Sequence, residues 1–250
     1  MNIRALSDLH GRLPYVEPCD ALLIAGDICP ITGDHSLQEQ ARFLNGPFKT
    51  WCEAIPTNQI VLIPGNHDFI FEQKAKGYHR ELAARVTLLV DQGIDLANDG
   101  PRVWGSPWVP NLPRWAFCGS QMKLREKADA IPPGYDIWLQ HGPPHPGSNR
   151  EYALDLVRRE HVGNRPMVEA INQKQPPLVI CGHIHERVGT ATFGETLVTN
   201  IAFVDNHYDA AWVQLEIDWD ADTRKIITSE ITPMNSERGL ACDCIRERWK

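Results

Sequence analysis

The sequence has no apolar run of the length that a membrane-spanning helix requires. About 20 consecutive apolar residues are needed to cross the hydrocarbon core of a bilayer, and the apolar runs of this chain are far shorter. The first strand-like segment begins at Asn2, which leaves no room for a signal peptide. We therefore expect a cytoplasmic protein that has no membrane segment.

The sequence also lacks an excess of positive charge. It contains 25 Lys and Arg residues against 32 Asp and Glu residues, which gives a formal net charge of -7. A broad basic patch for nucleic acid or for an anionic membrane surface is therefore not expected. Bound divalent cations would offset the acidic charge locally.

A disulfide framework is missing as well. The seven cysteines are odd in number and scattered through strand-like and helix-like segments, which favours reduced thiols. Cys242 and Cys244 form a C-x-C pair near the end of the chain, but no second Cys/His pair lies nearby. We assign no zinc site to this tail, and its role is left open.

The length and the order of the segments favour one α/β domain over residues 1–250. The chain is long enough for one substantial core, and it shows no internal repeat, low-complexity tract or linker. Helical patterns are expected at 36–54 with a break at Gly46-Pro47, and at 69–84, 122–130, 152–160 and 166–174. After His185 the pattern predicts successive antiparallel strands at 188–192, 196–199, 211–218 and 225–231.

Polar side chains that can bind metals follow five short apolar runs, at the point where each run ends. The runs are 3–6 with Asp8 and His10, 21–25 with Asp27, 60–63 with Asn66 and His67, 137–139 with His141, and 178–181 with His183 and His185. Because buried parallel strands deliver residues to the edge formed by their carboxyl ends, these residues should lie together. The pattern predicts an open α/β sheet with a site along one edge.

The side chains at these strand ends form a ligand set of nitrogen and oxygen atoms without a thiolate. They are two carboxylates, one amide and four imidazoles, namely Asp8, His10, Asp27, Asn66, His141, His183 and His185. Such a set suits manganese, iron, zinc or cobalt ions. Seven groups are too many for one tetrahedral ion but fit two adjacent ions if one carboxylate bridges them. A single D-x-H or H-x-H motif is more often a surface or core feature, so the prediction of a metal site depends on the presence of all five motifs at strand ends in one chain.

The order of the motifs resembles the calcineurin-like metallophosphoesterase family over residues 2 to about 200. The motifs are Asp8-x-His10, Gly26-Asp27, Gly65-Asn66-His67-Asp68, His141 and Gly182-His183-x-His185. Residues 105–108, 141–144 and 182–186 resemble its metallophosphoesterase-domain-containing subgroup, which is associated with cyclic-nucleotide phosphodiesterase activity. The segment Ile28-Cys29-Pro30 stands where the phosphoprotein phosphatase branch has Asp-Arg-Gly, which disfavours a Ser/Thr phosphatase.

The resemblance implies a four-layer fold of two mixed β-sheets flanked by helices, and a dinuclear metal centre. One ion would be held by Asp8, His10, Asp27 and His185, and the other by Asp27, Asn66, His141 and His183. Asp27 would bridge the ions, and a hydroxide between them would attack the phosphorus. His67 would stabilise or protonate the leaving oxygen, and Asp68 is a candidate to orient His67.

These features predict a metal-dependent phosphodiesterase that acts on a small-molecule phosphoester, with cyclic nucleotides as candidate substrates. A phosphomonoesterase acting on a nucleotide or small metabolite is the alternative among enzymes, and a non-catalytic metal-binding scaffold is the alternative of another class. The presence of His67 beside all seven ligands argues against the scaffold. Arg12, His145 and His207 are candidate substrate contacts, although loop residues of these types are often only exposed to solvent. Metal identity, natural substrate and oligomeric state are left open.

Overall fold

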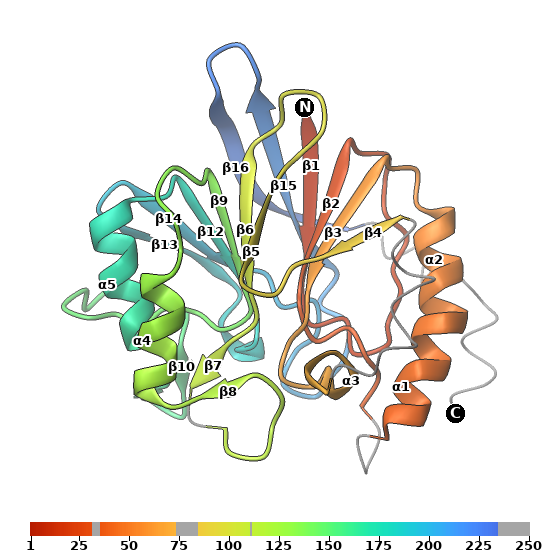
Figure 1. The fold of residues 1–250 in the computed structure, drawn as a ribbon, viewed down its shortest axis with the longest axis horizontal. Helices are drawn as coiled ribbons and strands as arrows, with labels where there is room; N and C mark the ends of the chain where they lie inside the picture. The colour runs from red at the N-terminus through yellow and green to blue at the C-terminus, as the bar shows by residue number, and fades with distance from the viewer. Residues whose placement is uncertain (32–35, 74–84, 111, 235–250) are drawn as a thin grey trace.

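Two mixed sheets pack face to face in the computed structural model, which describes residues 1–31, 36–73, 85–110 and 112–234 (Figure 1). Each sheet has six strands, in the orders β16-β15-β1-β2-β3-β4 and β13-β14-β12-β9-β6-β5. Helices cover the outer side of each sheet (Figure 1). The four-layer fold is therefore confirmed, whereas the expectation of a single open sheet is wrong, because the five strands that end in polar residues belong to both sheets.

The strands of the first sheet are β1 (Asn2–Leu6), β2 (Ala21–Ala25), β3 (Gln59–Ile63), β4 (Val86–Leu88), β15 (Val213–Asp220) and β16 (Lys225–Pro233). Those of the second are β5 (Gln92–Asp95), β6 (Arg102–Ser106), β9 (Ile137–Gln140), β12 (Leu178–Cys181), β13 (Gly189–Phe193) and β14 (Thr196–Asn200). The strands β1 to β4 are parallel to one another, as are β6, β9, β12 and β14. Both sheets therefore direct several carboxyl ends to one end of the molecule.

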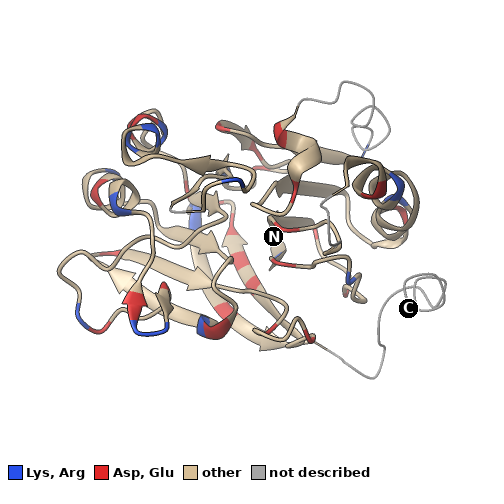
Figure 2. Ribbon diagram, turned by 90° about the horizontal axis from the view of Figure 1, so that it is seen from below, with Lys and Arg blue, Asp and Glu red and all other residues tan. Residues whose placement is uncertain are grey.

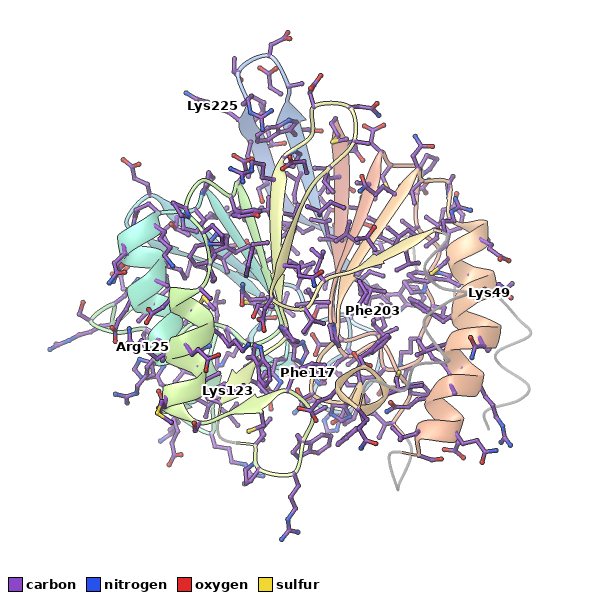
Figure 3. All side chains as sticks on the ribbon, in the orientation of Figure 1. Lys49, Phe117, Lys123, Arg125, Phe203 and Lys225 are labelled. Atoms are coloured by element: carbon purple, nitrogen blue, oxygen red, sulfur yellow. The ribbon has the colours of Figure 1, made fainter. Side chains whose placement is uncertain are left out.

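Apolar residues fill the spaces between the layers. Successive residues of β3 alternate in direction, so that Val61 and Ile63 pack in the cluster between the two sheets while Ile60 and Leu62 pack in the cluster beneath the helices. Figure 3 shows Phe203 inside the molecule and Lys49 and Lys225 at its outer surface. Burial on both faces explains why these strands are continuous apolar runs in the sequence.

The first sheet is covered by α1 (Leu37–Phe43) and α2 (Lys49–Ala54), and the second by α4 (Gln121–Asp129) and α5 (Arg165–Lys174) (Figure 1). The expected break at Gly46-Pro47 is wrong. A π-helical segment, η1 (Leu44–Phe48), joins α1 directly to α2, and its wider turn accommodates Pro47. The helices expected at 122–130 and 166–174 are confirmed as α4 and α5.

The helix expected at 152–160 is wrong. This segment forms a hairpin of β10 (Leu156–Val157) and β11 (Glu160–His161). Its turn residues Arg158 and Arg159 have φ angles of 49° and 72°, which a right-handed helix excludes. Of the helix expected at 69–84, the structure shows α3 (Phe69–Glu72), and the remainder from 74 lies outside the described residues.

The strands expected after His185 are all present, in two antiparallel hairpins. The hairpin β13–β14 belongs to the second sheet and β15–β16 to the first. Within the described residues no helix is long and apolar enough to cross a membrane. Figure 2 shows Lys and Arg residues dispersed over helices and loops on both sides of the molecule. The described cysteines are free, and Cys242 and Cys244 lie outside the described residues.

Candidate metal centre

The predicted ligands come together at the end of the molecule where β1, β2 and β3 of the first sheet and β9 and β12 of the second have their carboxyl ends. In Figure 1, β1 starts beside the N label at the top and runs downward, so this end lies at the bottom. The loops that leave the five strands carry Asp8 and His10, Asp27, Asn66, His141, and His183 and His185. Contacts across the sheet interface therefore build a site that neither sheet holds alone.

One group of ligand atoms consists of Asp8, His10 and His185, all within 4.8 Å of one another. Nε2 of His185 lies 3.3 Å from Oδ1 of Asp8 and 3.3 Å from Nε2 of His10. Burial opposes the ionisation of Asp8, yet the hydrogen bond and charge of His185 lower its pKa to about 2. A carboxylate and two imidazole nitrogens of this group could therefore bind the same metal ion.

A second group consists of Asp27, His141 and His183. Nε2 of His141 lies 3.3 Å from Oδ2 of Asp27 and 3.0 Å from Oδ1 of Asn66. The same Oδ2 of Asp27 lies 3.7 Å from Nε2 of His10. Asp27 also forms a third set of possible ligand atoms with His10 and His67, so its carboxylate joins the second group to the first.

The second ring nitrogens of two histidines contact backbone carbonyls. Nδ1 of His141 lies 2.8 Å from the carbonyl oxygen of Ala25, and Nδ1 of His185 lies 3.2 Å from that of Asp205. A proton on each Nδ1 donates to the carbonyl and leaves Nε2 to face the carboxylates. Metal-binding histidines are held by this type of hydrogen bond, so the donor set fits divalent transition metals.

Burial and charge give the histidines of the second group different protonation states. Burial lowers the pKa of His183 to about 3, and it has the same effect on His10 in the first group. Burial also disfavours charge on His141, but the Asp27 carboxylate raises the pKa of this imidazole to about 9. In the metal-free protein His141 and Asp27 therefore form an ion pair, and the other two rings are neutral.

The backbone around the ligands adopts conformations that side chains rarely favour. The φ angles are 54° at Asp8, 44° at His10, 53° at Asp27 and 69° at His183. Each such residue costs about 1 kcal/mol or more. Clusters of such residues are typical of functional sites.

Two glycines allow the loops to approach the carboxylates. A Cβ atom on Gly65 would lie 2.2 Å from Oδ1 of Asp27, and one on Gly182 would lie 2.0 Å from Oδ2 of Asp8. Both distances are shorter than non-bonded contacts of Cβ atoms in proteins, so a larger residue would displace the carboxylate. The sequence motifs contain glycine at these positions for a steric reason.

His67 lies beside both groups, and Asp68 ties the loops together. The backbone N–H of His67 donates to Oδ1 of Asp27 at 2.7 Å, and Nε2 of His67 lies 3.9 Å from Oδ2 of Asp27. The buried Asp68 carboxylate accepts hydrogen bonds from the backbone N–H groups of Ile28, Cys29 and Gly65. Asp68 thus fastens the loop after β2 to the loop after β3, a role that the sequence did not indicate. Its orientation of His67 stays a prediction.

A cavity of about 370 Å³ opens beside the ligand residues. At one end it is lined by Asp27, Asn66, His67, His183 and His185. Its other walls are apolar residues, among them Pro110, Leu112, Trp115, Val157 and Val162, and polar residues, namely Glu186, Asn206 and Tyr208. The ligand groups are therefore reached through a mostly apolar pocket.

The three predicted substrate contacts lie outside this set of lining residues. Arg12 donates to the backbone carbonyl of Tyr208 and lies 3.6 Å from Asp209. His145 packs against the ring of His161, and the exposed His207 lies between two residues that line the pocket. Roles for Arg12, His145 and His207 in substrate binding stay predictions. Apart from the motif residues, the lining residues are scattered over loops and a hairpin, so no spacing in the sequence indicated that they line a pocket.

Comparison with known proteins agrees with the motif order and the fold. The profile of the Metallophos family, described as Calcineurin-like phosphoesterase, matches residues 1–187. The human protein named Metallophosphoesterase domain-containing protein 1 is 26% identical over 242 residues, which cover 85% of this chain and 69% of that protein. UPF0046 protein C25E10.12 of Caenorhabditis elegans is 26% identical over 218 residues, covering 82% of this chain and 74% of that protein.

Solved structures show the same fold. The protein TT1561 of Thermus thermophilus matches with a TM-score of 0.56 and 15% identity over 94% of this chain and 99% of that chain. Another solved chain reaches a TM-score of 0.63 with 13% identity, again over 94% of this chain and 99% of its own length. These likenesses concern the fold alone. Because the family profile covers most of the sequence, the chain belongs to the calcineurin-like phosphoesterase family of metal-dependent phosphoesterases.

Proposed function

We propose that this protein hydrolyses phosphodiester bonds of small molecules with two divalent transition-metal ions, and that cyclic nucleotides are its first candidate substrates. The observation that carries the proposal is the position of Asp27. Its Oδ2 lies 3.3 Å from Nε2 of His141 in one ligand group and 3.7 Å from Nε2 of His10 in the other. A carboxylate shared by two ligand groups is what a bridged pair of ions requires.

Each ion would be held by one group together with Asp27. The first ion would take Asp8, His10 and His185, and the second would take Asn66, His141 and His183. Two such ions, of manganese, iron, zinc or cobalt, would supply charge that stabilises the phosphoryl oxygens and lowers the pKa of water. The buried carboxylates, whose pKa values are lowered at both Asp8 and Asp27, are ionised and ready to bind them.

His67 is the candidate proton donor to the leaving alcohol. Its side chain lines the pocket, its ring centroid is 4.7 Å from that of His10, and on another side it is 4.4 Å from a ring of Trp115. His67 therefore lies between the ligand groups and the apolar part of the pocket. From this position it would donate a proton to the leaving oxygen.

The charges in the pocket favour a diester over a monoester. A phosphomonoester carries nearly two negative charges at neutral pH, whereas a diester carries one. Among the described residues that line the pocket, none is Lys or Arg. Beyond the metals, the described lining residues therefore offer no Lys or Arg side chain to bind a second charge.

A substrate screen tests the proposal. Protein reconstituted with Mn²⁺, Co²⁺, Zn²⁺ or Fe²⁺ would be assayed on bis-p-nitrophenyl phosphate, p-nitrophenyl phosphate and cyclic nucleotides. We expect kcat/KM for the diester to exceed that for the monoester. A higher kcat/KM for the monoester would favour the phosphomonoesterase, and no turnover with any metal would favour the scaffold.

A further inference from the structure

We propose that the pocket beside the ligand groups is a subsite for the alcohol half of the substrate, that it takes a flat apolar group, and that Glu186 rejects alcohols that carry further negative charge. The inference rests on the proposed function in one respect, namely that the phosphoryl group binds at the ligand groups.

The apolar walls begin directly beside the reacting group. Leu112 and Trp115 come from the loop between β7 (Val109–Pro110) and β8 (Cys118–Gly119), and a ring of Trp115 lies 4.4 Å from that of His67. Val157 and Val162 come from the β10–β11 hairpin and the residue after it. An aromatic ring beside apolar side chains favours a flat apolar ligand over a sugar chain or a peptide.

The hairpin that supplies two of these walls is held in place by a buried carboxylate. Asp155 is fully buried, and its oxygens lie 2.7 Å from Nδ1 of His161 and accept the backbone N–H of Gly163 at 2.9 Å. These hydrogen bonds fix the residues before and after Val162 to the Asp155 side chain. The wall is therefore formed before a ligand arrives, which lowers the entropic cost of binding.

The volume of the pocket agrees with one small organic group. Pockets for drug-sized ligands have volumes of about 300–1,000 Å³, and this cavity of about 370 Å³ lies at the lower end of that range. Part of this volume adjoins the ligand groups and is needed for the phosphoryl group. One ring system fits the remainder.

Among the described residues, the polar rim of the pocket has a negatively charged side chain and no Lys or Arg to compensate it. Apart from the ligand groups, Glu186 is the one carboxylate among the described lining residues, and it follows His185 directly. The guanidinium of Arg12 donates to the Tyr208 carbonyl and lies 3.6 Å from Asp209, so its charge is directed to that loop. An alcohol with a second phosphate or a carboxylate would meet Glu186 without a cation to balance it.

Binding of phosphonates to the metal-reconstituted protein tests the inference without relying on turnover. The monomethyl esters of methylphosphonate, phenylphosphonate and 4-carboxyphenylphosphonate share one singly charged phosphoryl head, as a diester does, and isothermal titration calorimetry measures the Kd of each. We expect the phenylphosphonate ester to bind about tenfold more tightly than the methylphosphonate ester. In Trp115→Ala this ratio should fall to about threefold or less, whereas Tyr135→Ala, at the amino end of β9, should keep it.

The carboxylated ligand tests whether Glu186 rejects alcohols that carry further negative charge. We expect the 4-carboxyphenylphosphonate ester to bind about three- to tenfold more weakly than the phenylphosphonate ester, with Glu186→Gln removing the difference and Glu195→Gln, in the exposed turn between β13 and β14, retaining it. Equal affinity for methyl and phenyl ligands would overturn the subsite, and a penalty that persists in Glu186→Gln would overturn the role of Glu186. Failure of all three phosphonates to bind would contradict the phosphoryl site itself and hence the proposed function.

Discussion

The Asp27 carboxylate accepts the backbone N–H of His67 at Oδ1, 2.7 Å away, and its Oδ2 lies 3.9 Å from Nε2 of the same residue. One carboxylate oxygen therefore fixes the loop after β3, while the other faces the histidines of the candidate metal centre. Any change at Asp27 should disturb both the ligand groups and the position of His67. This double contact makes Asp27 the most informative residue to alter.

Asp27→Asn should remove metal from both sites, because a neutral amide does not balance two cations. Bound metal should fall from about two ions per chain to well below one, whereas Asp8→Asn should lose mainly one ion and retain about one. Elemental analysis after desalting measures both variants. Similar metal retention in the two variants would mean that Asp27 does not bridge.

His67→Gln should slow hydrolysis according to the leaving group. General acid catalysis contributes about 10²- to 10⁴-fold, so turnover of an alkyl or ribose phosphodiester should fall by a factor in that range. A p-nitrophenyl ester should lose much less, because p-nitrophenolate departs without protonation. Metal content measured in parallel should stay near that of the wild type. Equal losses for both substrates would assign His67 to phosphate positioning or electrostatic stabilisation.

Gly182→Ala should displace the Asp8 carboxylate, since the new Cβ would lie 2.0 Å from both Oδ2 of Asp8 and Oγ of Ser7. We expect the free energy of unfolding to fall by about 1–3 kcal/mol, together with loss of metal. Gly46→Ala is the matched control, because apart from its chain neighbours and the backbone of its own helix no atom lies within 4 Å of its added Cβ. That variant should change the free energy of unfolding by less than about 1 kcal/mol, because the helix preference of alanine is opposed by contact of its Cβ with the following Pro47. Urea denaturation distinguishes the two, and equal effects would contradict the steric account.

Metal affinity should rise with pH. The Asp27 carboxylate holds the His141 pKa at about 9 in the metal-free protein, so a cation that binds Nε2 must displace a proton below that pH. Burial lowers the pKa of His185, but its hydrogen bond with Asp8 raises that pKa above the usual value, so metal binding displaces a proton there as well. The apparent affinity should therefore increase at least tenfold per pH unit through neutral pH and level off above pH 9. His10 and His183, whose pKa values are about 3, release no proton in this range. Calorimetry in buffers of different ionisation enthalpy counts the protons, and a pH-independent affinity between pH 6 and 8 would refute the ion pair.

The strand ends were predictable because short buried strands followed by polar residues leave a clear pattern. The sequence did not indicate which sheet each strand belongs to, because β3 and β9 lie in different sheets and are equally apolar and buried on both faces. Only the family resemblance indicated two sheets. Partner choice between strands is set by packing over the whole fold, which local sequence does not record.

The wrong predictions of local secondary structure have physical causes. The segment 152–160 has residues that favour helices, but the left-handed backbone at Arg158 and Arg159 turns it into a hairpin. Pro47 predicted a helix break, but the π-helical segment accommodates the proline without ending the helix. Tertiary contacts override helix propensity in both places.

The candidate ligands were predictable and the pocket was not. Ligand residues repeat in short motifs, whereas Asn206 and Tyr208 have no spacing that distinguishes them, and the motif that contains Glu186 does not indicate that it lines a pocket. His207 illustrates the limit, because its two neighbours line the cavity while it is exposed itself. Loop conformation decides which side chain faces a pocket, and the sequence alone does not specify it.

The metal-to-protein ratio tests the account most directly. Wild-type protein would be stripped with chelator, reconstituted with excess Mn²⁺, Co²⁺ or Zn²⁺, desalted and measured by elemental analysis. Because Oδ2 of Asp27 lies near Nε2 of both His10 and His141 and would bridge two ions, we expect about two ions per chain. A ratio that stays at one for each of the three metals, with His183 and His185 intact, would contradict the two-metal site.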